Sequence, residues 1–133
     1  MSKPVLADTG PLYALADPSD QYHGRARKEL ARLESEGYFV AVAYPTISEA
    51  YTLVLRRLGS VFAVSWLREL LGGVSALNPE PGDYLAAAAH VQRLPHQEIS
   101  LFDAIAAALS RRLKLPVWTF DQDFDLLRAR QWR

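Results

Sequence analysis

The sequence predicts an α/β protein with a parallel sheet, on three observations. Short apolar runs rich in β-branched and aromatic residues alternate with longer helical patterns, and this alternation is typical of parallel sheets. Hydrophobic residues make up 50% of the chain, which is enough for a packed core. With 133 residues, no repeat and no linker, the chain suits one domain over residues 1–133.

The first predicted strand covers residues 4–8 and leads into a short helix. Thr9-Gly10-Pro11 supplies a turn, a possible cap and a proline suited to a first helical turn, so this helix is expected at about residues 12–16. A second helix lies between Asp20, which can cap it, and Gly37, which can end it. Its apolar residues fall on one side, as in a helix that packs on a sheet.

The middle of the chain predicts a buried strand and two helices. Residues 38–43 are apolar throughout, which suits a strand covered on both faces. Helices are expected at about residues 46–58 and 60–71, because Gly59 separates two helical patterns and Gly72-Gly73 ends the second.

The last part of the chain predicts two strands and two helices. Residues 74–77 suit an edge strand, and residues 82–94 have an alanine-rich helical pattern. Residues 100–113 are apolar on nearly every face, so this helix should be buried against the sheet. Residues 116–120 form the last clear strand. The chain after Asp121 is compatible with a short turn or helix and a final short strand.

Four acids fall at equivalent places in this pattern. Asp8 and Asp121 stand at the carboxyl ends of the first and the last clear strand. Glu49 begins the helix after the second strand, and Asp103 begins the buried helix before the last strand. Carboxyl strand ends and helix starts can gather along one edge of an open α/β sheet. We therefore expect the four acids to meet there.

Each acid also has an ordinary structural explanation. Thr46-x-x-Glu49 and Ser100-x-x-Asp103 match the capping box, in which the acid reaches back to the cap backbone. Asp8 could cap the first helix, and Asp121 could belong to a turn. These readings are compatible with a shared site, because the helix dipole also favours an acid in a first helical turn.

A cluster of carboxylates calls for a cation. Two carboxylates about 4 Å apart repel by about 4 kcal/mol at an effective dielectric constant of about 20, and a divalent ion removes that repulsion. Oxygen ligands without cysteine suit Mg²⁺ or Mn²⁺ better than zinc. Since Mg²⁺ keeps several waters and engages phosphates, the site points to phosphoryl chemistry.

The composition excludes other classes. Without cysteine, the chain has no disulfide framework, thiolate metal site or cysteine nucleophile. Because no apolar run approaches roughly 20 residues and no signal peptide is evident, a cytoplasmic protein without membrane contact is expected. The formal net charge of +0 does not by itself indicate a nucleic-acid partner.

The segments that carry the acids follow one another along nearly the whole chain. They are Asp8–Leu15, Ser48–Leu53, Ser100–Ala108 and Thr119–Phe124. With these segments the chain resembles the PIN-domain family, and more narrowly the VapC-type toxins of type II toxin–antitoxin systems. The resemblance implies a three-layer α/β/α sandwich around a parallel sheet of four to five strands. It also implies Mg²⁺- or Mn²⁺-dependent endoribonuclease activity on RNA, a homodimer and a cognate antitoxin as partner.

The resemblance extends to particular residues. The family's acidic, catalytic positions match Asp8, Glu49, Asp103 and Asp121. Thr119 matches a hydroxyl position that helps to order the site, and Asp123 is a further supporting candidate.

The expected mechanism is metal-assisted hydrolysis of a phosphodiester. Asp8 and Asp103 would be the principal ligands of the first ion. Glu49 and Asp121 would act through water or help to bind a second ion. Water activated by the cation would attack phosphorus in line, which leaves 5′-phosphate and 3′-hydroxyl ends. Two alternatives stay open: a non-hydrolytic PIN-like module that binds a protein or RNA partner, and action on DNA.

Each of several side chains near the acids has both a possible functional role and a purely structural explanation. Arg56 and Arg57 could contact the RNA backbone or lie on a solvated helix face. Thr9 could hydrogen-bond a ligand carboxylate or only cap a helix. Tyr13 could stack on a base, although packing explains it equally simply.

Overall fold

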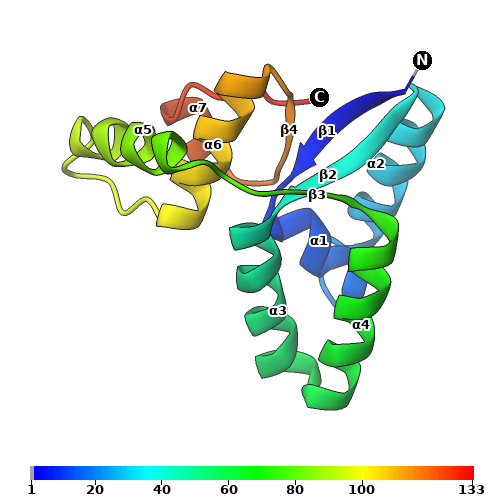
Figure 1. Cartoon of the computed structure of the whole chain (residues 1–133). Helices are drawn as coiled ribbons and strands as arrows, with labels where there is room; N and C mark the ends of the chain where they lie inside the picture. Colours follow the sequence, from blue (N-terminus) through cyan, green and yellow to red (C-terminus); the bar gives the residue numbers. More distant parts are fainter. Residues whose placement is uncertain (1) are drawn as a thin grey trace.

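The computed structural model describes residues 2–133 (Figure 1). Its strands are β1 (Lys3–Ala7), β2 (Tyr38–Ala43), β3 (Ser75–Leu77) and β4 (Val117–Trp118). Its helices are α1 (Thr9–Ala16), α2 (His23–Ser35), α3 (Tyr44–Leu58), α4 (Ser60–Gly73), α5 (Pro81–Gln92), α6 (Leu101–Leu113) and α7 (Asp123–Leu126). Within these described residues, the strands form one all-parallel sheet in the order β3-β2-β1-β4, which confirms the predicted fold class.

The strand β1 is central and buried on both faces. Leu6 pairs with Ala41 of β2 on one side and with Val117 of β4 on the other. Leu6 packs in one core cluster, whereas its neighbours Val5 and Ala7 pack in the other. This alternation explains why the strand is apolar at consecutive positions. Because the pairing is parallel, β1, β2 and β4 all end at the same edge of the sheet.

The two core clusters define three layers. One cluster joins a face of the sheet to α5, α6 and α7, and the other joins the opposite face to α1, α2, α3 and α4. Figure 1 shows the two groups of helices on opposite sides of the strands. The expected α/β/α sandwich is therefore confirmed.

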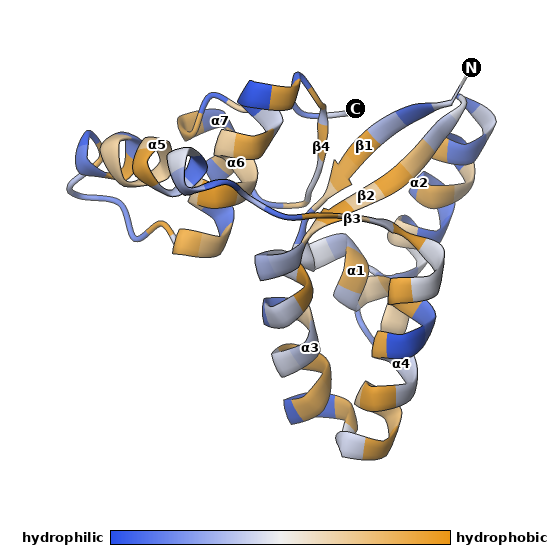
Figure 2. Ribbon diagram, in the orientation of Figure 1, coloured by the Kyte–Doolittle hydropathy of each residue, from blue (hydrophilic) through white to orange (hydrophobic). Residues whose placement is uncertain are grey.

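Hydropathy follows these layers. Figure 2 shows hydrophobic residues along β2 and both polar and hydrophobic residues on α2, as expected for a buried strand and a surface helix.

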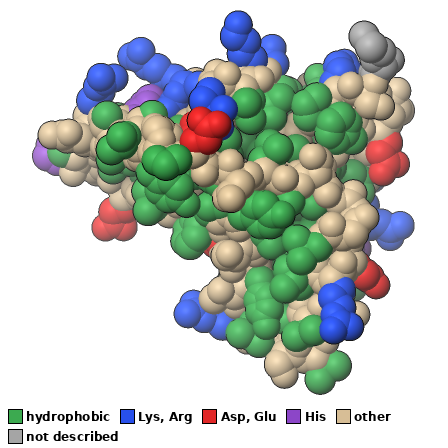
Figure 3. Space-filling model, in the orientation of Figure 1, with side chains coloured by type: hydrophobic (Ala, Val, Ile, Leu, Met, Phe, Trp, Pro, Cys, Tyr) green, Lys and Arg blue, Asp and Glu red, His purple; other side chains and the backbone are tan. Residues whose placement is uncertain are grey.

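Figure 3 shows basic side chains gathered over the α6–α7 end of the molecule. Among residues 2–133, no helix combines the length and the hydrophobicity that a bilayer span requires.

Several predicted boundaries were wrong. Helix α1 begins at Thr9 and not at residue 12, and α3 begins at Tyr44 and not at residue 46. Both helices carry a proline in their first turn, Pro11 and Pro45. A proline is tolerated there because the first helical N–H groups lack a partner within the helix. Each proline therefore indicates that its helix begins before it, at Thr9 in α1 and at Tyr44 in α3.

The sheet is shorter at its β4 edge than predicted. Strand β4 ends at Trp118, so the predicted strand over residues 116–120 is reduced to two residues. The final strand expected before the C-terminus is an isolated parallel bridge between Val117 and Gln131. Two backbone hydrogen bonds of 2.8 Å hold it, from Val117 N–H to the Arg130 carbonyl and from Trp132 N–H to the Val117 carbonyl.

Candidate metal centre

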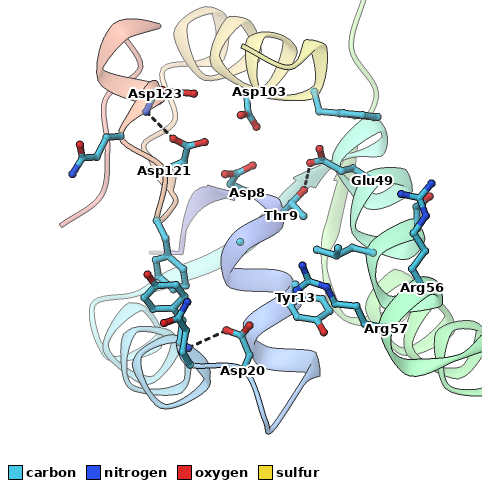
Figure 4. A pocket seen from close by; sticks show the side chains of 18 residues that line it. Asp8, Thr9, Tyr13, Asp20, Glu49, Arg56, Arg57, Asp103, Asp121 and Asp123 are labelled. Carbon is cyan, nitrogen blue, oxygen red and sulfur yellow. Dashed lines mark hydrogen bonds between the residues drawn. The ribbon is translucent and has the colours of Figure 1, made fainter. Parts of the chain in front are cut away.

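A cleft of about 1130 Å³ opens at the carboxyl edge of the sheet. The predicted acids come to it from four separate segments, the ends of β1 and β4 and the helices α3 and α6 (Figure 4). Those acids, all of which line the cleft, are Asp8, Glu49, Asp103 and Asp121. The expectation that they converge is therefore confirmed.

Asp8 is buried at the start of α1, with 5% of its surface exposed. It occupies the N-cap position, but its side chain makes no capping hydrogen bond. The Thr119 hydroxyl instead donates to Asp8 Oδ2 over 2.9 Å. The Asp8 backbone N–H donates to the Trp118 carbonyl, also over 2.9 Å, and so extends the pairing of β1 with β4 to the site. The Asp8 carboxylate thus lines the cleft and does not cap the helix.

Glu49 lies in the second turn of α3, not at the start of the helix. Since α3 begins at Tyr44, Thr46 is a buried residue within the helix, and the capping-box reading of Glu49 is wrong. The Thr9 hydroxyl donates to Glu49 Oε1. This bond joins the first turn of α1 to α3 and matches the expectation that Thr9 would bind one of the acids.

Asp103 lies in the first turn of α6. The Ser100 side chain caps this helix by accepting a 3.1 Å hydrogen bond from the Asp103 backbone N–H. The Asp103 carboxylate faces the cleft beside Asp8 (Figure 4). Oxygen atoms of Asp8, Glu49 and Asp103 lie within 4.8 Å of one another. Three carboxylates can therefore reach one cation.

Asp121 belongs both to a turn and to the cluster. Its backbone N–H donates to the Thr119 hydroxyl over 2.9 Å, and its Oδ1 accepts from the Asp123 N–H over 2.9 Å. Carboxylate oxygens of Asp103, Asp121 and Asp123 form a second group within 4.8 Å. Asp103 is common to both groups, so the acids form one continuous cluster.

Burial raises the pKa of three of the clustered acids. Burial raises the pKa of Asp8 to about 6, and the charges of Glu49 and Asp121 act in the same direction, while hydrogen bonds from the Thr9 backbone and the Thr119 side chain act in the opposite direction. Burial, followed by the charges of the other acids, raises the pKa of Asp103 to about 8. Burial and the charge of Asp121 also raise the pKa of Asp123. In all three, the charge of a neighbouring acid adds to the effect of burial.

The cluster fits a hard divalent cation. Its donors are carboxylate oxygens from several chain segments, which Mg²⁺ and Mn²⁺ prefer and which leave room for water ligands. A bound cation would favour the ionised form of these carboxylates and so oppose the upward pKa shifts.

Basic and aromatic residues also line the cleft. Arg56 and Arg57 line it from α3, where Figure 4 shows them across the cleft from Asp121 and Asp123. The Arg57 guanidinium lies 4.9 Å from the centroid of the Tyr13 ring. Tyr13 is buried, and its hydroxyl donates to Asp17 over 2.6 Å, so packing explains this tyrosine.

The sequence analysis missed three aromatic residues of the cleft, Tyr22, Phe102 and Phe120. Tyr22 and Phe120 line the wall and pack against each other. The position of Phe120 directly before Asp121 was a usable signal, because a residue next to a site acid must lie near the site. Nothing in the sequence indicated Tyr22.

The fold and the cleft define a class of α/β proteins with a carboxylate cluster at the carboxyl edge of a parallel sheet. The chain belongs to the PIN domain family, whose model matches residues 5–129. The VapC-type resemblance is confirmed by solved structures. VapC20 from Mycobacterium tuberculosis, described as a sarcin–ricin loop cleaving toxin, has a TM-score of 0.83 and 26% identity and covers 97% of this chain and 98% of its own.

Two more distant structures share the fold. VapBC2 from Rickettsia felis has a TM-score of 0.77 and 11% identity, with 98% of both chains covered. VapBC-1 from nontypeable Haemophilus influenzae has a TM-score of 0.75 and 16% identity, with 98% of this chain and 97% of its own covered. A search of curated proteins found no significant match.

Proposed function

We propose that this protein is a metal-dependent endoribonuclease that acts as the toxin of a toxin–antitoxin pair. The observation that carries the proposal is the convergence of Asp8, Glu49, Asp103 and Asp121 in one cleft of a PIN fold. The similarity to VapC20, a toxin that cleaves the sarcin–ricin loop, supports RNA as the substrate.

Asp8 and Asp103 are the proposed principal ligands of Mg²⁺ or Mn²⁺. Glu49 completes their group, and Asp121 with Asp123 extends it through water or toward a second ion. When bound, such a cation lowers the pKa of water and stabilises the negative charge that develops at phosphorus. By holding the ion, carboxylates from several segments would fix the position of a phosphodiester that the ion binds.

The remaining residues of the site orient these acids and bind RNA. Thr119 fixes Asp8, and Thr9 fixes Glu49, so neither carboxylate is free to turn away from the cleft. Arg56 and Arg57 are the proposed contacts to the RNA backbone, because arginine pairs well with phosphate. We expect this activity in the cytoplasm.

The decisive experiment is an RNA-cleavage assay with and without Mg²⁺ or Mn²⁺. The parent protein should cleave only with metal, and Asp103→Asn should lose at least about 100-fold in rate. Glu69→Gln is the matched control, because Glu69 is an exposed acid of α4 outside the cleft. Equal cleavage by the parent and Asp103→Asn would reject the proposal.

The chemistry of the cleaved ends tests the mechanism separately. Attack by water leaves a 5′-phosphate and a 3′-hydroxyl, which end-labelling detects. A 2′,3′-cyclic phosphate would instead indicate attack by the ribose hydroxyl and would contradict a metal-assisted hydrolysis. A parallel digestion of DNA tests the preference for RNA.

A homodimer and a protein antitoxin are the proposed partners. The helix α4 exposes the apolar residues Val61, Phe62 and Val64 near its start, and Figure 3 shows hydrophobic side chains over α3 and α4. Such a surface is typical of an interaction face. A dimeric mass in solution that becomes monomeric in Val61→Asp would support a dimer through α4.

A further inference from the structure

Tyr22 presents an exposed aromatic ring to the cleft. Tyr22 and Phe120 both line the wall, with ring centroids 5.4 Å apart and planes inclined at 45°. Phe120 is partly buried, whereas Tyr22 keeps 43% of its surface exposed. Tyr13, which lines the same cleft, is buried. The Tyr22 ring is therefore available to a ligand, and packing does not account for its exposed part.

The ring stands on a rigid support. The Arg25 guanidinium lies 4.3 Å from the centroid of Phe120. Arg25 Nε donates to one carboxylate oxygen of Glu29 over 2.8 Å, and the indole of Trp118 donates to the other over 2.8 Å. Trp118 is buried in strand β4. Phe120 thus contacts both Arg25 and Tyr22, and through Arg25 and Glu29 this wall is tied to the buried Trp118.

The backbone of Tyr22 is also held in place. Its N–H donates to Asp20 Oδ2 over 2.9 Å, and its carbonyl accepts from the Ala26 N–H of α2 over 2.9 Å. A ring held in this way has little conformational entropy left to lose when a ligand stacks on it.

Phe120 connects the Tyr22 ring with the acidic cluster. Phe120 directly precedes Asp121, and a Cβ atom added to Gly10 would lie 3.6 Å from Phe120 Cδ2. Arg56 and Arg57 line the same cleft. A nucleic-acid strand in the cleft can thus place a phosphate at the acids and arginines while a neighbouring base reaches the aromatic wall.

We propose that Tyr22 is the stacking platform for one unpaired nucleobase of the RNA substrate, a role that rests on the proposed ribonuclease function. A base within a duplex has no free face, because its neighbours cover both sides, whereas an unpaired base can stack on an aromatic ring. The geometry therefore selects RNA in which the nucleotide beside the scissile phosphodiester is single-stranded or turned out of a helix.

The test measures binding of a short single-stranded RNA that carries 2-aminopurine, whose fluorescence is quenched by stacking. Binding is measured in EDTA in an Asp103→Asn background, where cleavage is prevented and the comparison does not depend on bound metal. Tyr22→Ala should weaken binding about 5- to 150-fold and abolish the quenching on the bound protein. Tyr22→Phe keeps the ring and should bind within about twofold of the background protein.

Two further variants separate stacking from structure. Tyr22→Leu keeps apolar volume against Phe120 without an aromatic face, so it should remain folded and lose the quenching. Tyr84→Ala is the matched control, since Tyr84 of α5 is 42% exposed and lies outside the cleft, and its binding should equal that of the background protein. The same RNA in a perfect duplex should bind more weakly and without dependence on Tyr22.

The outcomes distinguish this inference from the proposed function. RNA cleavage by the parent protein together with unchanged quenching in Tyr22→Leu would reject the platform and leave the nuclease proposal standing. Tyr22-dependent quenching without any metal-dependent cleavage would reject the nuclease proposal and leave the platform standing. Equal dependence of duplex binding on Tyr22 would overturn the selection for unpaired RNA.

Discussion

At the scale of single residues, two threonine hydroxyls organise the acidic cluster. A hydroxyl can donate one hydrogen bond and accept others, so it can join two groups that would repel each other. Thr119 donates to Asp8 and accepts from the backbone N–H of Asp121, and Thr9 donates to Glu49. These bonds hold carboxylates from different segments without adding charge.

Removal of the Thr119 hydroxyl should weaken metal binding. Thr119→Val keeps the shape of the side chain but leaves Asp8 Oδ2 and the Asp121 N–H without this partner. We expect a loss of about 10- to 100-fold in Mn²⁺ affinity, measured by isothermal titration calorimetry. The control is Thr52→Val, because Thr52 lines the cleft but its hydroxyl donates to the Ser48 carbonyl of its own helix. Equal affinities of Thr119→Val and the parent would contradict this role.

Loss of Arg57 should change the salt dependence of RNA binding. A side chain that neutralises one phosphate of a single strand contributes about 0.7 to the slope of log K against log salt concentration. Arg57→Ala should reduce the slope by about this amount, measured by fluorescence anisotropy at several salt concentrations. Arg68→Ala is the control, since Arg68 is exposed on α4 outside the cleft. A slope that is the same in both variants would argue against a phosphate contact at Arg57.

At the scale of elements, the sequence predicted most of the fold and the four acids of the site. Strand β2 has the predicted bounds, because an uninterrupted apolar run between a glycine and a proline leaves few alternatives. The start of α3 was missed, since Pro45 read as the end of a strand and not as part of a first helical turn, and Glu49 was therefore placed one turn too early.

Contacts between distant segments limited the rest of the prediction. Strand β4 was expected to reach Phe120, but it ends at Trp118, and the Thr119 hydroxyl donates to Asp8. This contact joins residues far apart in the sequence, so the local sequence pattern does not predict it. The pairing of Tyr22 with Phe120 depends on how α2 lies against the end of β4. Residue type and spacing along the chain predict a helix or a strand. They do not predict a contact such as that of Tyr22 with Phe120, which forms only when the layers pack.

The helix that carries Asp103 is held to α5 by an ion pair between the partly exposed Arg112 and the buried Asp83. Asp83 is 3% exposed, accepts two 2.8 Å hydrogen bonds from Arg112 of α6, and accepts another from the Glu80 N–H. Arg112→Ala would leave a buried carboxylate without its counter-charge. We expect a loss of about 2 kcal/mol in the free energy of unfolding, measured by urea denaturation, because Arg112 itself is partly exposed.

The control for this prediction is an exposed pair. Arg133→Ala removes an ion pair with Asp125 in which both side chains are mostly exposed, so it should cost less than about 0.5 kcal/mol. If Arg112→Ala were as mild as Arg133→Ala, the pair between α5 and α6 would be as weak as a surface ion pair.

At the scale of the whole molecule, acidic and basic residues are equal in number but unevenly distributed in space. The formal net charge is +0, yet the acidic cluster is concentrated in one cleft, while basic side chains gather over the α6–α7 end (Figure 3). Like charges in a partly buried place destabilise the folded state unless protons or a cation neutralise them. The metal-free fold is therefore under electrostatic strain that depends on pH.

The direction of this dependence follows from the raised pKa values. Asp8 and Asp103 titrate at about 6 and about 8 in the folded protein, against an ordinary value of 3.8. Between about pH 4 and pH 8 the folded protein thus binds more protons than the unfolded chain, so its free energy of unfolding falls as pH rises. Below that window the free energy of unfolding falls as pH falls. Arg112 holds the pKa of Asp83 below its usual range, and the stabilisation from this pair is lost when acid protonates Asp83.

The metal-free protein should consequently melt at a lower temperature at pH 8 than at pH 5. We expect a fall of about 5–10 °C in EDTA, measured by differential scanning calorimetry, after allowance for solvent screening at the partly exposed Asp103. Mn²⁺ should reverse the fall and act more strongly at pH 8, because binding requires deprotonated carboxylates. Asp103→Asn should flatten the pH dependence and lose most of the response to Mn²⁺, whereas Glu69→Gln should behave as the parent. A melting temperature that stays constant or rises from pH 5 to pH 8 in EDTA would mean that the four acids do not share one electrostatic site.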